Sequence, residues 1–113
     1  MKRAKSHKYN AAGQEWKDLI CRLGCIVCWR EFRFYSPCVP HHRLINGRAC
    51  QDTEAIPLCA GHHQTGGYGV AFHATGRKTW EAKYGTEAAL FEDTRQRIEQ
   101  MVAAQERPRI CLA

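Results

Sequence analysis

The chain has 113 residues, which fits one compact domain, and a formal net charge of +6. Its apolar runs are too short for a membrane span, and no charged-then-apolar secretory leader opens it. Seven cysteines, an odd number, argue against a closed disulfide framework and favour thiolates that bind metal in a reducing cytoplasm. We therefore expect a cytoplasmic protein, monomeric or weakly dimeric, whose positive charge favours a polyanionic partner.

A basic arm and a short helix are predicted at the N-terminal end. Residues 1–14 are polar and lack apolar periodicity, so we expect a flexible arm ahead of a domain over residues 15–113. An apolar face at helical spacing predicts a helix from Trp16 to Leu23 that Gly24 ends. A tight knuckle over residues 25–28 follows, and then an extended segment that contains Phe32, Phe34 and Tyr35.

A two-stranded hairpin is predicted in the middle of the chain. The first strand enters over residues 37–42, Asn46-Gly47 is a strong turn signal, and residues 55–58 return. A helix opens at Cys59 and is broken early by the glycine-rich run over residues 65–69.

Two helices are predicted to close the chain. Trp80 and Tyr84, one turn apart, indicate a short helix that ends at Gly85. Thr86 is a suitable cap for a last helix over residues 86–106, which has one mostly apolar face. The predicted fold class is therefore α+β: a small hairpin domain with a zinc knuckle, flanked by N- and C-terminal helices.

Two ligand pairs have the spacing of zinc knuckles. Cys25-x-x-Cys28 and Cys59-x-x-His62 each leave two residues between ligands, so the backbone can curl and bring both side chains to one ion. Thiolate and imidazole donors suit structural Zn²⁺. The remaining cysteines are Cys38 and Cys50, which are competing ligands, and Cys21 and Cys111, which are interpreted as a helix-face thiol and a tail thiol.

Four further histidines gather in the same part of the sequence. They are His41, His42, His63 and His73. Four histidines this close in the sequence are hard to explain as unrelated polar residues that each form their own hydrogen bonds. The cluster therefore predicts a second, catalytic metal site. Adjacent residues in a strand point to opposite faces, so His41 and His42 can share this site only at a twisted strand end or at the strand edge.

The motifs together resemble a known nuclease family. Cys-x-x-Cys, Pro-His-His, the stretch Ile56-Pro-Leu-Cys-Ala-Gly-His-His63 and His73-Ala-Thr-Gly look like the HNH (β-β-α-metal) endonuclease superfamily. The closing stretch, from Gly69-Val-Ala-Phe-His to Trp80-Glu-Ala-Lys-Tyr-Gly85, resembles a phage and prophage branch related to the recombination-enhancement (Ref) nucleases.

The resemblance implies a hairpin and helix that hold one divalent ion: Mg²⁺, Mn²⁺, Ni²⁺ or Zn²⁺. By position, His42 resembles the general base, and the metal ligands are His41, His63 and His73. The structural zinc set corresponds to Cys25, Cys28, Cys59 and His62.

Two departures from the family pattern concern the hairpin and its loop. The family pattern has an Asn just before the helix that braces the hairpin loop, and no Asn stands there in this sequence; Asn46 lies too early in the chain. We therefore expect Asp52 or Glu54 to brace the hairpin or to orient a site histidine. His73 lies ten positions after His63, whereas ligands on one helix face need about four. The glycine-rich loop must therefore fold back to deliver His73.

These features predict a DNA-cleaving enzyme. Basic side chains near the proposed site are expected to contact DNA phosphates: Arg43, Arg48, Arg77 and Lys78. No recognition helix is evident, so we expect little sequence preference. The resemblance implies a metal-dependent endonuclease of phage or prophage recombination or DNA processing, with a recombinase filament as a partner that presents the DNA. The alternatives are a non-catalytic zinc module that binds nucleic acid and a two-zinc structural or protein-interaction domain.

Overall fold

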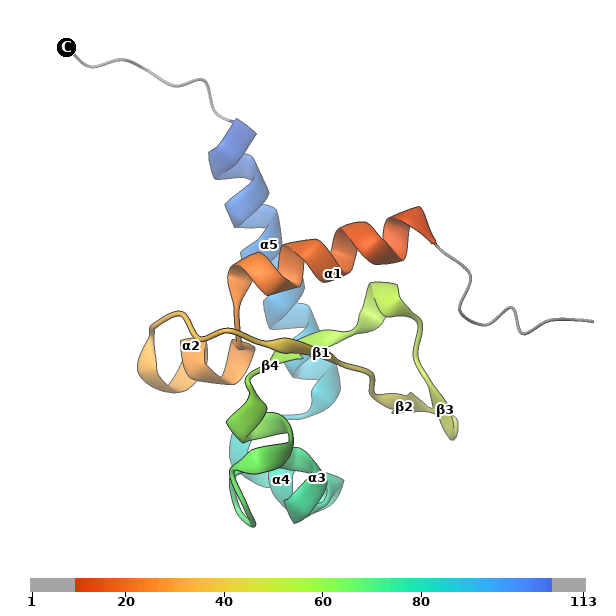
Figure 1. Cartoon of the computed structure of the whole chain (residues 1–113), viewed down its shortest axis with the longest axis vertical. Coiled ribbons are helices and arrows are strands. Elements are labelled where there is room, and N and C mark those ends of the chain that lie inside the picture. Colours follow the sequence, from red (N-terminus) through yellow and green to blue (C-terminus); the bar gives the residue numbers. More distant parts are fainter. Residues whose placement is uncertain (1–9, 107–113) are drawn as a thin grey trace, which may run out of the picture.

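The computed structural model describes residues 10–106, which form an α+β fold (Figure 1). The α-helices are α1 (Ala11–Leu23), α2 (Ile26–Phe32), α3 (Phe72–Thr75), α4 (Arg77–Tyr84) and α5 (Glu87–Glu106). The strands are β1 (Val39–His41), β2 (Leu44–Ile45), β3 (Arg48–Ala49) and β4 (Ile56–Leu58). A 3₁₀ turn, η1 (Asp52–Glu54), precedes β4, and a π-helix, η2 (Gly61–Thr65), follows it. Within the described range, no helix is both long and apolar enough to cross a membrane.

The first helix begins earlier than the sequence predicts. The Asn10 side chain accepts a hydrogen bond from the Gly13 backbone N–H at 2.9 Å and so caps α1. Gly13 is buried against η1, where an added Cβ would lie 2.9 Å from the Cβ of Asp52. Residues 11–14 therefore belong to the helix and not to the predicted arm, whose residues 1–9 lie outside the described range. Gly24 ends α1 at φ +90°, as predicted.

The cysteine knuckle begins a helix. Cys25 Sγ accepts from the Cys28 backbone N–H at 3.4 Å, and α2 runs from there to Arg33, whose φ of +62° ends it. The predicted extended segment was placed too early, because Phe32 is still helical; Phe34 follows in the loop that leads to β1.

The predicted hairpin is confirmed. β1 pairs antiparallel with β4, with Val39 opposite Leu58 and His41 opposite Ile56. The hairpin tip is the β2–β3 pair, where Asn46 and Gly47 both take positive φ values (55° and 80°), as the turn requires. In Figure 1 this tip extends away from the helices.

Helices pack on the hairpin through two clusters of buried side chains. One joins α1 and α5 through Ile20, Leu23, Ala55 and Ile98. The other lies around Trp80 and comprises Cys25, Ile26, Val27, Cys28, Ile56, Leu58, Trp80 and Leu90. Figure 1 shows α1 crossing α5 and the hairpin lying between these helices and the α3–α4 pair. The metal-ligand candidates lie where these elements meet.

Candidate active site

The Cys-x-x-Cys and Cys-x-x-His pairs converge in the interior. The donor atoms of Cys25, Cys28, Cys59 and His62 all lie within 4.8 Å of one another. The Cys28 and Cys59 sulfurs are 3.8 Å apart, and His62 Nδ1 lies 3.2 to 3.8 Å from the three sulfurs. A tetrahedron with metal–sulfur bonds of about 2.3 Å and a metal–nitrogen bond of about 2.0 Å has edges of about 3.5 to 3.8 Å. The four side chains therefore could hold one metal ion.

The electrostatics of this cluster call for a cation. Burial raises the pKa of Cys25, and the charges of Cys59 and Cys28 raise it further. Burial likewise raises the pKa of Cys28. Burial lowers the pKa of His62, so its imidazole is neutral and able to donate a lone pair. Burial also acts to raise the pKa of Cys59, but hydrogen bonds from the His62 backbone and from the Cys25 and Cys28 side chains outweigh it and lower that pKa. A positive ion would balance the charge of three thiolates this close together, so the donor chemistry fits a bound metal.

A second group of donors lies beside the first. Nitrogens of His41, His63 and His73 also lie within 4.8 Å of one another. The Nε2 atoms of His63 and His73 are 3.1 Å apart, a separation that suits two imidazoles on one ion with bonds of about 2.0 to 2.1 Å. Burial, and then the charges of His41 and His73, lower the pKa of His63 to about 4, so His63 is neutral at physiological pH. These three side chains could hold a second ion.

Three different elements deliver these histidines. His41 ends β1, His63 is in the π-helix η2, and His73 is in α3. The loop between η2 and α3 folds back, as the sequence requires. It is tight at Gly66, where a Cβ would lie 2.4 Å from the Gly61 carbonyl oxygen.

A buried carboxylate orients the first histidine. His41 Nε2 and Glu87 Oε2 are 2.6 Å apart, and both side chains are almost fully buried. With Nε2–H donating to the carboxylate, Nδ1 of His41 carries the free lone pair. Glu87 is in turn held in place, because its backbone N–H donates to Glu81 Oε2 at 2.7 Å and Arg77 Nε lies 3.5 Å from its other oxygen.

His42 has a different partner. Its Nε2 lies 2.7 Å from Asp52 Oδ1, and the hydrogen bond from His42, together with Lys17, lowers the pKa of the Asp52 carboxyl. An ionised Asp52 accepts the Nε2–H, which leaves Nδ1 of His42 as the basic nitrogen. Glu54, the other candidate for this part, instead lies 3.6 Å from Arg43.

One cleft is lined both by His42 and by two members of the three-histidine group, His41 and His73. It has a volume of about 280 Å³ and is lined by His41, His42, Arg43, Leu44, Phe72, His73, Arg77 and Glu87. His41 and His42 reach the same cleft because β1 ends at His41, so the strand alternation no longer separates them.

Two of the four basic residues predicted to contact DNA line this cleft. Arg43 lies over the Phe91 ring at 5.5 Å and Arg77 comes from the start of α4. Arg48 is exposed on the β2–β3 tip and Lys78 is exposed on α4, and neither lines the cleft.

The remaining cysteines of the described chain stand apart from both donor groups. Cys38 lies within 3.4 Å of the Ile20 carbonyl oxygen, and Cys50 is half-buried after β3. Cys21 is exposed on α1, as a helix-face thiol should be. Cys111, expected in the tail, lies outside the described residues. Neither competing ligand, Cys38 or Cys50, joins the four-donor group.

Comparison with known families identifies the chain's relatives. Residues 10–99 match the model of a family described as recombination enhancement, RecA-dependent nuclease. The chain belongs to this family. The part of the chain that matches the RecA-dependent nuclease family includes α1, both donor groups and the first part of α5. No significant match was found among curated proteins or solved structures. The resemblance to recombination-enhancement nucleases is thereby confirmed, and a nuclease role in recombination is supported.

Glu87 was not among the site residues predicted from the sequence. Its contact with His41 spans 46 residues along the chain, and an acidic residue at the start of a helix is common for reasons of helix polarity alone. The available signal was its position directly after the capping Thr86, which places a carboxylate at the first turn of α5, where it can be buried.

Proposed function

We propose that the protein is a metal-dependent endonuclease of the HNH type, which hydrolyses DNA phosphodiester bonds with little sequence preference during phage or prophage recombination. The observation that carries this proposal is one cleft containing both an Asp-oriented histidine, His42, and a face of a three-histidine metal-ligand group. Membership of a nuclease family supplies the class of reaction.

His42 is the proposed general base. Its Nε2–H donates to Asp52, so Nδ1 is the nitrogen that can accept a proton from a water molecule in the cleft. The Asp52 carboxylate fixes the ring orientation and stabilises the imidazolium that forms. Asp52 thus takes the hairpin-bracing part for which the sequence left Asp52 and Glu54 as candidates.

His41, His63 and His73 are the proposed ligands of the catalytic ion, with Glu87 orienting His41. A bound divalent ion there supplies positive charge next to the scissile phosphate and the departing oxygen. Imidazole donors suit Zn²⁺, Ni²⁺ or Mn²⁺, while Mg²⁺ prefers oxygen. The Cys25, Cys28, Cys59 and His62 group is the proposed structural zinc site, because its four donors leave an ion no open position.

Arg43 and Arg77 are the proposed phosphate contacts within the cleft, and Arg48 and Lys78 extend the basic surface around it. DNA is the proposed substrate. The family description also names RecA, so we propose that a recombinase filament presents the DNA.

A plasmid assay tests the proposal. The protein is incubated with supercoiled plasmid and Mg²⁺ or Mn²⁺, with and without RecA filaments formed on a homologous strand. Nicking that EDTA abolishes is expected, and His42→Ala should slow it by about 100- to 10,000-fold, the range for loss of a general base. Gln100→Ala, an exposed change on α5, is the matched control and should cut normally. Metal-independent binding without any nicking would favour the non-catalytic nucleic-acid module instead.

A further inference from the structure

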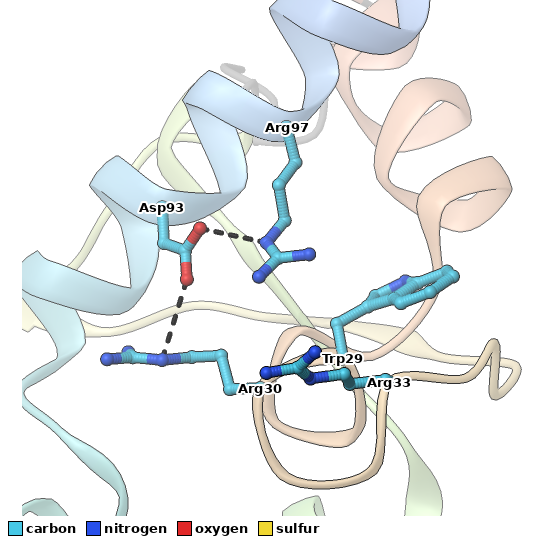
Figure 2. A pocket seen from close by; sticks show the side chains of 5 residues that line it. All are labelled: Trp29, Arg30, Arg33, Asp93 and Arg97. Atoms are coloured by element: carbon cyan, nitrogen blue, oxygen red, sulfur yellow. Dashed lines mark hydrogen bonds and ion pairs between the residues drawn. The ribbon is translucent and has the colours of Figure 1, made fainter.

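A second hollow lies outside the cleft, between α2 and α5. It has a volume of about 510 Å³ and is lined by Trp29, Arg30, Arg33, Asp93 and Arg97 (Figure 2). It shares no lining residue with the histidine cleft. Nothing in the proposed hydrolysis uses this group of side chains.

The hollow is strongly positive and partly organised. Asp93 lies 3.5 Å from Arg30 Nε and 2.8 Å from Arg97 Nε, so one carboxylate holds two guanidiniums by their inner nitrogens (Figure 2). Their outer N–H groups remain available to an anion. Arg33 has no ion-pair partner among the described residues, and in Figure 2 its guanidinium lies beside Arg30. Three guanidiniums facing one carboxylate leave two positive charges, which suits a phosphate backbone.

Exposed aromatic rings flank Arg33 in the sequence. Phe32, Phe34 and Tyr35 are 57%, 53% and 51% exposed, although burial would be favourable for each ring. The Phe32 and Phe34 rings stack on each other, with centroids 5.5 Å apart and planes within 13°. The left-handed backbone of Arg33 ends α2 between them, so a guanidinium and two rings come from three successive residues.

We propose that this platform, formed by residues 29–35 with Arg97, binds single-stranded DNA outside the cleft. Unpaired bases stack on exposed aromatic rings while arginines follow the sugar–phosphate backbone, and both kinds of group are present here. A duplex hides the faces of its bases and would use only the arginines. The choice of DNA as the polyanion rests on the proposed function; the preference for a single strand rests on the exposed rings. The protein therefore grips one separated strand on the platform while the cleft acts on the phosphodiester bond.

Binding of fluorescent oligonucleotides tests the platform. Anisotropy is measured for a labelled oligo-dT and for a labelled hairpin duplex of mixed sequence, with the zinc-loaded protein in buffer without added Mg²⁺ or Mn²⁺. The double variant Phe32→Ala/Phe34→Ala should bind oligo-dT about 10-fold or more weakly and the duplex within about 3-fold of wild type. Phe34→Tyr, which keeps the ring, should bind oligo-dT as wild type does. Arg33→Ala should lower the affinity for both oligonucleotides. For oligo-dT it should also reduce the slope of log affinity against log salt concentration by about 0.7.

Tyr68→Ala is the matched control, because Tyr68 is 76% exposed but lies in the glycine-rich loop and does not line the hollow between α2 and α5. Unchanged oligo-dT affinity in the double variant would overturn the proposal, as would equal losses for oligo-dT and duplex. Displacement of oligo-dT by polyglutamate at equal charge would also overturn it, in favour of an acidic protein partner. Plasmid nicking is scored separately: a wild type that binds through the platform but never nicks refutes the nuclease and not the platform.

Discussion

The two donor groups have related chemistry and opposite surroundings. The Cys25–Cys28–Cys59–His62 group offers four donors, and none of these residues is exposed. The His41–His63–His73 group offers three, and burial decreases from His41 to the exposed His73 at the cleft. A closed four-donor set satisfies an ion completely, whereas a three-donor set beside a cleft leaves positions for water and substrate. On this ground we propose that the first group stabilises the fold and the second serves the chemistry.

Removal of a sulfur donor from the cysteine group should have the greatest effect on stability. Cys28→Ser should prevent cooperative folding or lower the melting temperature steeply, because structural zinc contributes about 10 to 16 kcal/mol of binding free energy to small domains whose total stability is about 5 to 15 kcal/mol. Thermal melting by circular dichroism and elemental analysis of zinc check this. Cys38→Ser, a half-buried thiol outside both groups, should have a much smaller effect. Equal losses in the two variants would mean that the cysteine group holds no ion.

Removal of the exposed histidine, His73, should reduce activity strongly but stability only slightly. His73→Ala is expected to slow plasmid nicking by at least about 100-fold, because a catalytic ion contributes several kcal/mol to transition-state stabilisation. The metal content should fall from two ions per chain to one, while the melting temperature changes by only a few degrees. A variant that retains both ions and full activity would remove His73 from the site.

The buried carboxylate allows a finer test. Glu87→Gln keeps the shape of the side chain but loses its charge, so His41 should be held less firmly and be a weaker donor. We expect the affinity for a divalent ion at the histidine group to fall about 10- to 100-fold. Titration of the zinc-loaded protein with Mn²⁺ or Co²⁺ measures this. Glu92→Gln, an exposed change on the same helix, is the control; an identical affinity in both variants would contradict the role given to Glu87.

The smallest expected effect concerns Asp52. Hydrogen bonding from His42 lowers the pKa of this carboxyl, so its stabilising contribution is complete above the unfolded value of about 3.9 and disappears as the pH falls through the lowered folded value. The side chain is 40% exposed, so Asp52→Asn should cost at most about 1 kcal/mol at pH of about 7. Urea unfolding should show this difference shrinking toward pH of about 2. A difference that stays constant with pH would mean that the pair does not stabilise the fold.

Local spacing was sufficient to predict much of the site. Two residues between ligands can meet one ion whatever the rest of the fold does, and the four-donor group formed as that spacing indicates. The turn at Asn46-Gly47 and the fold-back to His73 are likewise encoded locally, by residues that tolerate positive φ and by a glycine-rich run. The prediction that His63 and His73 belong to one metal site came from the family resemblance, because their spacing of ten residues is not that of one helix face.

Contacts between distant segments could not be predicted in this way. Helix α1 begins at Ala11, five residues before the predicted start at Trp16, because Asn10 caps it and because Gly13 packs against Asp52. Glu87 meets His41 only once α5 has docked on the hairpin. The choice between Asp52 and Glu54 depended on which carboxylate the folded hairpin brings to His42, and that is a property of the tertiary structure.

His62 and His63 are consecutive in η2, yet each belongs to a different donor group. The backbone that presents one imidazole inward to the sulfurs therefore presents the next toward the cleft, and the two arrangements arise together. If the proposed roles hold, a nascent or damaged copy that lacks its structural zinc also lacks an assembled reactive centre. Folding and assembly of the reactive centre would then be a single event, because one short segment supplies a ligand to each group.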